Sequence, residues 1–191
     1  MSAVRPLPLR ELAEALVLQP DASMEQLAQA IGVSRATLHR MVASRDDLLS
    51  QVNALAYQSC LDTFAQVGLD DAPVEDVLPQ LIQAIRPDAT LFLLLQQQGR
   101  TCRDPRVLQQ LEHDWTVQRQ RLARFFERGQ ASGVIRTDLP AAWLVDVMAA
   151  LINAATASLH EGRIPSHDFE RLIRETLLTG VRAIPGATPS A

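Results

Sequence analysis

Apolar residues recur every three or four positions along most of this chain, which is the spacing of one face of an α-helix. Stretches of strict alternation, which are typical of strands, are few, and aromatic residues make up only 4% of the chain. The pattern therefore predicts an all-α fold. Beyond two short N-terminal helices that follow Ser23 and Ser34, the expected helices lie at residues 7–18, 46–67, 72–98, 105–129, 141–160 and 166–183.

Two stretches of the pattern belong in a protein core. The run LFLLL at residues 91–95 is apolar on every side, and Pro87 just before it is expected to kink or break the helix. Residues 141–159 are apolar enough to suggest a membrane span, but a central aspartate, Asp146, costs about 2.5–3.5 kcal/mol on insertion into lipid. We therefore expect burial against other helices and no membrane partner.

The stretch at residues 23–49, SMEQLAQAIGVSRATLHRMVASRDDLL, predicts a helix, a tight turn and a second short helix. Ser23 is the expected N-cap of the first helix with Gln26 three residues later, and Ser34 and Thr37 repeat this spacing before the second. Between the two helices, Gly32 can adopt the positive φ that a sharp turn requires. The stretch therefore resembles a helix-turn-helix.

The second short helix carries residue types that suit DNA. In helix-turn-helix proteins the N-terminal half of this helix reaches base edges, where arginine can bind guanine bidentately and a small residue can approach a thymine methyl group. Residues 1–50 hold five arginines and six acids, but residues 32–45 hold three arginines and no acid. An ordinary helical hairpin with a solvated face remains the alternative.

The run MEQLAQAIGVSRATLHRMVASRDDLL resembles the DNA-binding segment of the TetR-type regulators over about fifty residues. The resemblance implies a DNA-binding domain at residues 1–50, an effector-binding and dimerisation domain at 51–185, and a tail at 186–191. It also implies a phosphate contact for Arg45, whereas His39 stands where the family usually has a tyrosine. The predicted DNA-binding residues are Ser23, Ser34, Arg35, Ala36, Thr37, His39, Arg40 and Arg45.

The resemblance further implies a homodimer formed by the last two helices and a small-molecule effector held inside the second domain. A helical hairpin within one chain and ordinary core packing are the respective alternatives. The expected dimer interface consists of thin or apolar positions of these helices, namely Ala150, Ala154, Ala157, Ile173, Leu177 and Val181. The expected effector pocket consists of aromatic or amphipathic residues of core helices, namely Phe64, Phe92, Gln96, Trp115, Gln118, Phe126, Met148 and Asn153.

The sequence thus predicts a homodimeric DNA-binding regulator, a repressor that a small lipophilic effector releases from a palindromic double-stranded DNA operator. A TetR-like sensor or adaptor with weak or lost DNA binding is the alternative, because the first domain is acidic overall. Clusters at residues 112–114 and 160–168 combine histidine with acids, but in no recognisable catalytic or zinc-binding spacing. We therefore predict no enzyme activity, cofactor or metal, and two cysteines without a signal peptide point to the reducing cytoplasm.

Overall fold

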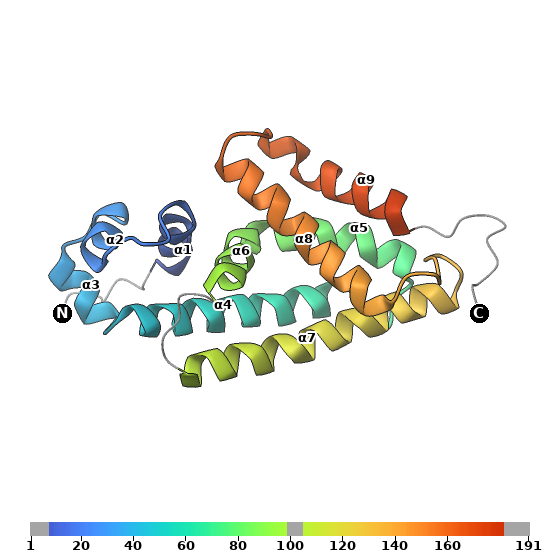
Figure 1. Cartoon of the computed structure of the whole chain (residues 1–191), viewed down its shortest axis with the longest axis horizontal. Helices are drawn as coiled ribbons and strands as arrows, with labels where there is room; N and C mark the ends of the chain where they lie inside the picture. Colours follow the sequence, from blue (N-terminus) through green and yellow to red (C-terminus); the bar gives the residue numbers. More distant parts are fainter. Residues whose placement is uncertain (1–7, 99–104, 182–191) are drawn as a thin grey trace. The chain divides into compact units, whose positions relative to one another are not determined.

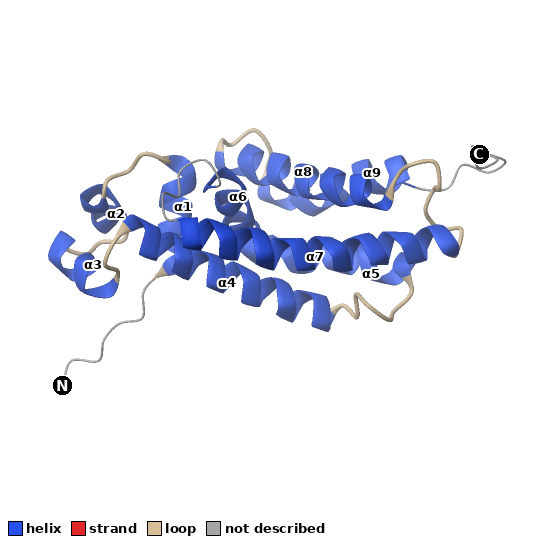
Figure 2. Cartoon of the chain, turned by 60° about the horizontal axis from the view of Figure 1, so that its bottom comes forward, coloured by secondary structure: helices blue, strands red, loops and turns tan. Residues whose placement is uncertain are grey.

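The computed structural model of the chain describes residues 8–98 and 105–181, which form helices joined by turns (Figures 1 and 2). The all-α prediction is therefore confirmed. The elements are α1 (Leu9–Leu18), α2 (Met24–Ala30), α3 (Arg35–Met41), α4 (Arg45–Gln66), α5 (Val74–Ile85), η1 (Arg86–Asp88), α6 (Ala89–Gln98), α7 (Pro105–Ala131), α8 (Ala141–His160), η2 (Ser166–Asp168) and α9 (Phe169–Val181).

Proline determines where several of these helices begin or end. Pro87 lies in η1, the single 3-10 turn that separates α5 from α6, because its ring clashes with the preceding helical turn. Pro105 opens α7, where its missing N–H is not needed. The last predicted helix was too long at its start, since residues 166–168 form η2 and α9 begins only at Phe169. Its predicted end, residues 182 and 183, lies outside the described residues.

The chain divides into two compact units, and each has its own core. The first contains residues 1–58 and 90–111, and the second contains residues 59–89 and 112–191. In the first, Leu91, Leu93 and Leu94 of the apolar run are buried as predicted, whereas Phe92 is half-buried. Because α4 and α7 each contribute residues to both units, these units do not coincide with the predicted domains 1–50 and 51–185, which stay a prediction about function.

Helix α8 has the length and apolar composition of a membrane span. In the second unit, however, it packs against α9, and its Leu144, Val145, Met148 and Ile152 are buried. These contacts support the expectation of a core helix, since helices that are apolar all round occur in protein cores as well as in membranes.

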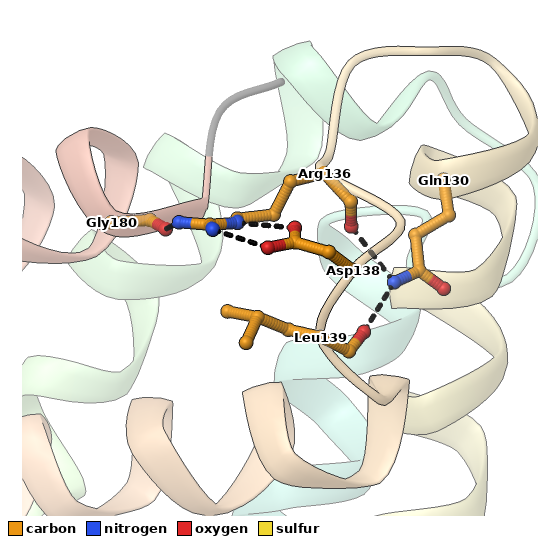
Figure 3. A network of polar contacts seen from close by, with 5 residues as sticks. All are labelled: Gln130, Arg136, Asp138, Leu139 and Gly180. Carbon is orange, nitrogen blue, oxygen red and sulfur yellow. Dashed lines mark hydrogen bonds and ion pairs between the residues drawn. The ribbon is translucent and has the colours of Figure 1, made fainter. Parts of the chain in front are cut away.

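The turn between α7 and α8 caps the C-terminus of α9 (Figure 3). The Arg136 backbone N–H donates to the Val181 carbonyl at 2.8 Å, and its guanidinium donates to the Gly180 carbonyl at 3.3 Å. Asp138 holds that guanidinium with both carboxylate oxygens, and Gln130 donates to the Arg136 carbonyl at 2.9 Å. The last carbonyls of a helix have no hydrogen-bond partner within the helix, and this turn supplies donors to two of them. It also places the positive charge of Arg136 at the helix C-terminus, where the helix dipole favours it.

Two helical glycines of the second unit should respond in opposite ways to alanine. A Cβ at Gly129 would lie 2.7 Å from Ile135 Cδ1 and 3.0 Å from Val74 Cγ1, whereas a Cβ at Gly180 meets nothing within 4 Å. Because Ile135 and Val74 are buried, we expect Gly129→Ala to destabilise the protein by about 1–2 kcal/mol. Gly180→Ala should stabilise it by about 0.5 kcal/mol. Urea unfolding of both variants measures the difference, and equal effects would contradict the packing at Gly129.

Candidate nucleic-acid interface

Helix α2 and the turn after it have the local geometry that the sequence predicts. Ser23 Oγ accepts from the Gln26 backbone N–H at 3.2 Å, and Gln26 Oε1 accepts from the Ser23 N–H at 2.7 Å, which completes a capping box. Gly32 has φ +69°, and the Val33 N–H donates to the Ala28 carbonyl at 2.9 Å. The turn therefore directs the chain sharply from α2 into α3.

Helix α3 begins at a second cap and turns one polar face outward. Ser34 Oγ accepts from the Thr37 N–H at 3.1 Å, and Leu38 on the inner face is fully buried. The Arg40 guanidinium donates to Thr37 Oγ1 at 3.3 Å. The side chains of Arg35, Ala36, His39 and Arg40 are exposed. These four lie at i, i+1, i+4 and i+5, so they share one face of the helix.

The start of α4 holds a capping motif that the sequence analysis missed. Ser44 Oγ accepts from the Asp47 N–H at 3.1 Å, and Asp47 Oδ2 accepts from the Ala43 N–H at 2.8 Å. The signal is present in the sequence as a serine followed three residues later by an acid. The link between α3 and α4 is therefore held at a defined geometry.

Arg45, which the resemblance implied as a phosphate contact, is half-buried at the first position of α4. Its guanidinium donates to the Ala22 carbonyl at 3.0 Å and also to the Pro20 carbonyl. Both acceptors lie in the loop between α1 and α2. The structure thus gives this side chain a contact inside the protein.

The comparisons with known proteins agree with this geometry. No family model matches the chain. The HTH-type transcriptional regulator NfxB of Pseudomonas aeruginosa is 29% identical over 174 residues, covering 90% of this chain and 91% of NfxB. The HTH-type transcriptional repressor LfrR of Mycolicibacterium smegmatis is 22% identical over 166 residues, covering 87% of this chain and 84% of LfrR.

Solved structures show the same fold. PfmR, a TetR family regulator from Thermus thermophilus, superposes with a TM-score of 0.69 at 20% identity, covering 90% of this chain and 96% of PfmR. LfrR from Mycobacterium smegmatis in complex with proflavine also gives 0.69 at 20% identity, covering 92% and 94% of the two chains. The chain has the fold of the TetR family regulators. These relatives are transcription regulators, in agreement with the prediction that the chain is not an enzyme.

Two of the predicted effector-pocket residues come together around an arginine that the sequence pattern did not indicate. The Arg121 guanidinium lies 5.2 Å from the centre of the Phe64 ring and donates to Gln118 Oε1 at 3.1 Å. It also pairs with Asp70 at 2.6 Å. Phe64 and Gln118 are both only 2% exposed. The sequence pattern did not indicate a role for Arg121, because that role depends on where the α4–α5 loop lies in the fold.

The other six predicted pocket residues are spread over both compact units. In the second unit, Phe126 and Met148 are buried in the core, and Trp115 and Asn153 are half-buried. In the first unit, Phe92 is half-buried and Gln96 is exposed. An open pocket of about 460 Å³ in the second unit is lined by Asp70, Arg124, Glu127, Arg128 and Ala131. The pocket contains none of the predicted effector-pocket residues. Of the residues that contact Arg121, only Asp70 also lines this pocket.

Charge and burial around Arg121 shift two neighbouring pKa values in opposite directions. Burial raises the pKa of the Cys60 thiol to about 12, although Arg121 nearby opposes the shift, so the thiol stays neutral and unreactive. The hydrogen bond from Arg121, with added charge from Arg124 and Arg128, lowers the pKa of Asp70 below its usual value. The Asp70 carboxylate is therefore negatively charged throughout the neutral range.

Acid should remove the stabilisation that this ion pair provides. Because the pKa of Asp70 is lower in the folded state, the pair stabilises the fold above about pH 4 and loses its effect as the pH falls through the lowered pKa. We expect Asp70→Asn to reduce the free energy of unfolding by up to about 1 kcal/mol at pH 7, since Asp70 is half-exposed. Urea unfolding at pH 7 and pH 3 tests this, and a difference that persists undiminished at pH 3 would refute it.

The predicted dimer-interface residues fall into two groups. Ile173, Leu177 and Val181 of α9 are at most 3% exposed, because they pack inside the second unit of their own chain. Ala150 and Ala154 of α8 are exposed, and Ala157 is half-buried. Trp143, which the sequence pattern did not indicate, is 54% exposed and precedes these alanines on the same helix. Together, Trp143, Val147, Ala150 and Ala154 form one stripe along α8, which we call the α8 stripe.

A metal-binding cluster does not emerge in the part of the chain that the structure describes. No group of three or more histidine, cysteine, aspartate or glutamate side chains there could hold a metal ion. In the polar cluster at residues 160–168, Glu161 pairs with Arg163 at 2.7 Å and Asp168 pairs with Arg171 at 2.9 Å. These acids therefore belong to surface ion pairs.

Proposed function

We propose that this chain is a DNA-binding transcription regulator, and that α3 is its recognition helix. The observation that carries the proposal is the exposed face of α3, where Arg35, Ala36, His39 and Arg40 stand free of the core. These side chains offer guanidinium donors for guanine and a small surface for a thymine methyl group. Exposed caps at Ser23 and Ser34 leave the N-termini of both short helices open toward an anionic backbone.

The regulator works as a homodimer in which the α8 stripe of one chain packs on a second copy. Trp143 supplies a large apolar surface, and Ala150 and Ala154 allow two helices to approach closely. Two-fold symmetric dimers are the commonest assemblies, and two recognition helices related in this way match a palindromic operator. The buried residues of α9 then support the α8 stripe from inside the same chain.

A small lipophilic effector controls the regulator by releasing it from the operator, which makes it a repressor. LfrR has been solved in complex with proflavine, so a chain of this fold can hold a small aromatic molecule. In this chain, two of the predicted pocket residues, Phe64 and Gln118, both contact Arg121. An effector can shift the regulator only if it binds the released state more tightly than the DNA-bound state.

Selection from a random pool of DNA tests the proposal directly. The purified full-length protein is mixed with the pool at low and moderate salt, without effector, and the retained DNA is sequenced. Enrichment of an inverted repeat is the expected result and would establish both recognition and two-fold symmetry. A folded dimer that enriches nothing would refute DNA recognition and favour the sensor or adaptor alternative.

A further inference from the structure

Arg45 occupies a position where a positive charge is unfavourable. It is the first residue of α4, and a positive charge at a helix N-terminus is disfavoured by the helix dipole. The two residues that follow it, Asp46 and Asp47, are acids, as the dipole favours. The unfavourable charge at Arg45 is therefore offset by contacts that the guanidinium makes elsewhere.

Those contacts lie in the loop between α1 and α2. The guanidinium donates to the carbonyls of Ala22, at 3.0 Å, and Pro20, and Ala22 itself is buried. The residue after Ala22 is Ser23, whose N–H and side chain form the capping box of α2. One planar side chain thus joins the first turn of α4 to the chain immediately before the first turn of α2. The planar guanidinium presents donors on two separate nitrogens, so it holds both carbonyls at a fixed geometry that a lysine ammonium does not impose.

We propose that Arg45 is a positioning residue for operator binding, which sets the helix-turn-helix relative to the first turn of α4, and is not a phosphate contact. Helices α2 and α3 pack against each other, and α3 is joined to α4 through the cap at Ser44. Arg45 adds a second connection, through the loop that leads into α2. With both connections in place, the exposed face of α3 keeps one orientation with respect to α4, and a displacement of the start of α4 carries α3 with it.

A phosphate contact and a positioning role for Arg45 predict different effects of the substitution Arg45→Lys. A phosphate contact needs mainly the positive charge, which Arg45→Lys retains, whereas two fixed carbonyl contacts need the guanidinium. A lost phosphate contact would weaken binding to all DNA alike, because phosphate contacts carry no sequence information. A misplaced recognition helix weakens binding to the operator alone. This inference rests on the proposed function, since it requires a specific operator.

The experiment measures the affinity of Arg45→Lys and Arg45→Met for the selected operator and for unrelated DNA of equal length, by fluorescence anisotropy. Arg174→Lys and Arg174→Met are the matched controls, because Arg174 is an exposed arginine of α9. We expect both Arg45 variants to lose about tenfold or more in operator affinity, with unrelated DNA bound as by the wild type. The Arg174 variants should match the wild type on both DNAs.

Wild-type operator affinity in Arg45→Lys, or an equal loss on both DNAs in Arg45→Met, would overturn the positioning role. Circular dichroism verifies that each variant is helical. If a variant is not helical, NMR of the Arg45 guanidinium in the wild-type protein decides between the two roles. Slowly exchanging Nη protons in the free protein support the positioning role, and protons protected only after operator is added refute it. Absence of operator binding by the wild type itself would instead count against the proposed function.

Discussion

Replacing Arg35 and Arg40 together by alanine is expected to abolish specific operator binding while the protein stays folded and dimeric. Each base-contacting arginine contributes about 1–3 kcal/mol of discrimination, so the pair accounts for a loss between about thirtyfold and twenty-thousandfold. Both side chains are exposed, so their removal leaves the core intact. Fluorescence anisotropy with the selected operator measures the loss, and size-exclusion chromatography verifies the dimer.

The single variants refine this prediction. Arg40 donates to Thr37 Oγ1 within α3, so its removal has a small local effect in addition to any loss of DNA contact. If either arginine reads a base, its removal relaxes the sequence preference at one position of each half-site. Arg174→Ala is the matched control and should bind as the wild type does. Unchanged operator affinity in the double variant would show that α3 does not read DNA.

Introducing arginine at Ala154 is expected to convert the proposed homodimer into a monomer and thereby remove most of the operator affinity. Ala154 is exposed on the α8 stripe, where a second helix can approach only if the side chain is small. An arginine in this contact would be buried without a partner or would hold the two helices apart. Since linking two binding modules raises affinity by about 10²–10⁴, a monomer should lose a factor of this size. Sedimentation velocity and anisotropy measure the two effects.

Gln83→Arg is the matched control for this variant. Gln83 is an exposed residue of α5, so the same charge is added to the second unit away from the α8 stripe. We expect it to remain dimeric with unchanged operator affinity. A dimeric Ala154→Arg would place the interface on another surface, and a monomeric variant with full operator affinity would contradict the requirement for two recognition helices.

The sequence predicted the local features of the DNA-binding part because these features depend on short-range physics. The Ser23 and Ser34 caps and the positive φ at Gly32 each involve residues within a few positions of one another, and the structure confirms them. Pro87 acts through its own ring on the preceding turn, and this too was predicted correctly. The missed Ser44 and Asp47 cap belongs to the same class, since its spacing was visible in the sequence.

The roles of individual long side chains were decided only by the tertiary structure. Arg45 contacts carbonyls more than twenty residues away, and Arg121 meets Asp70 from a different element. Nothing in the local pattern distinguishes such arginines from solvated ones, because a guanidinium reaches whatever acceptor the fold brings near it. The same applies to the apolar residues of α9, where periodicity shows that a face is buried but does not show against which partner.

The sequence by itself determined the helical class, most helix bounds, the helix-turn-helix and its exposed polar face, because backbone caps, turns and periodicity are properties of neighbouring residues. The tertiary structure decided that Ile173 and Leu177 pack within their own chain, that Trp143, Ala150 and Ala154 of α8 are exposed, and that Arg45 connects α4 to the loop before α2. These assignments depend on which distant surfaces meet, and that is set by the sum of all packing contacts.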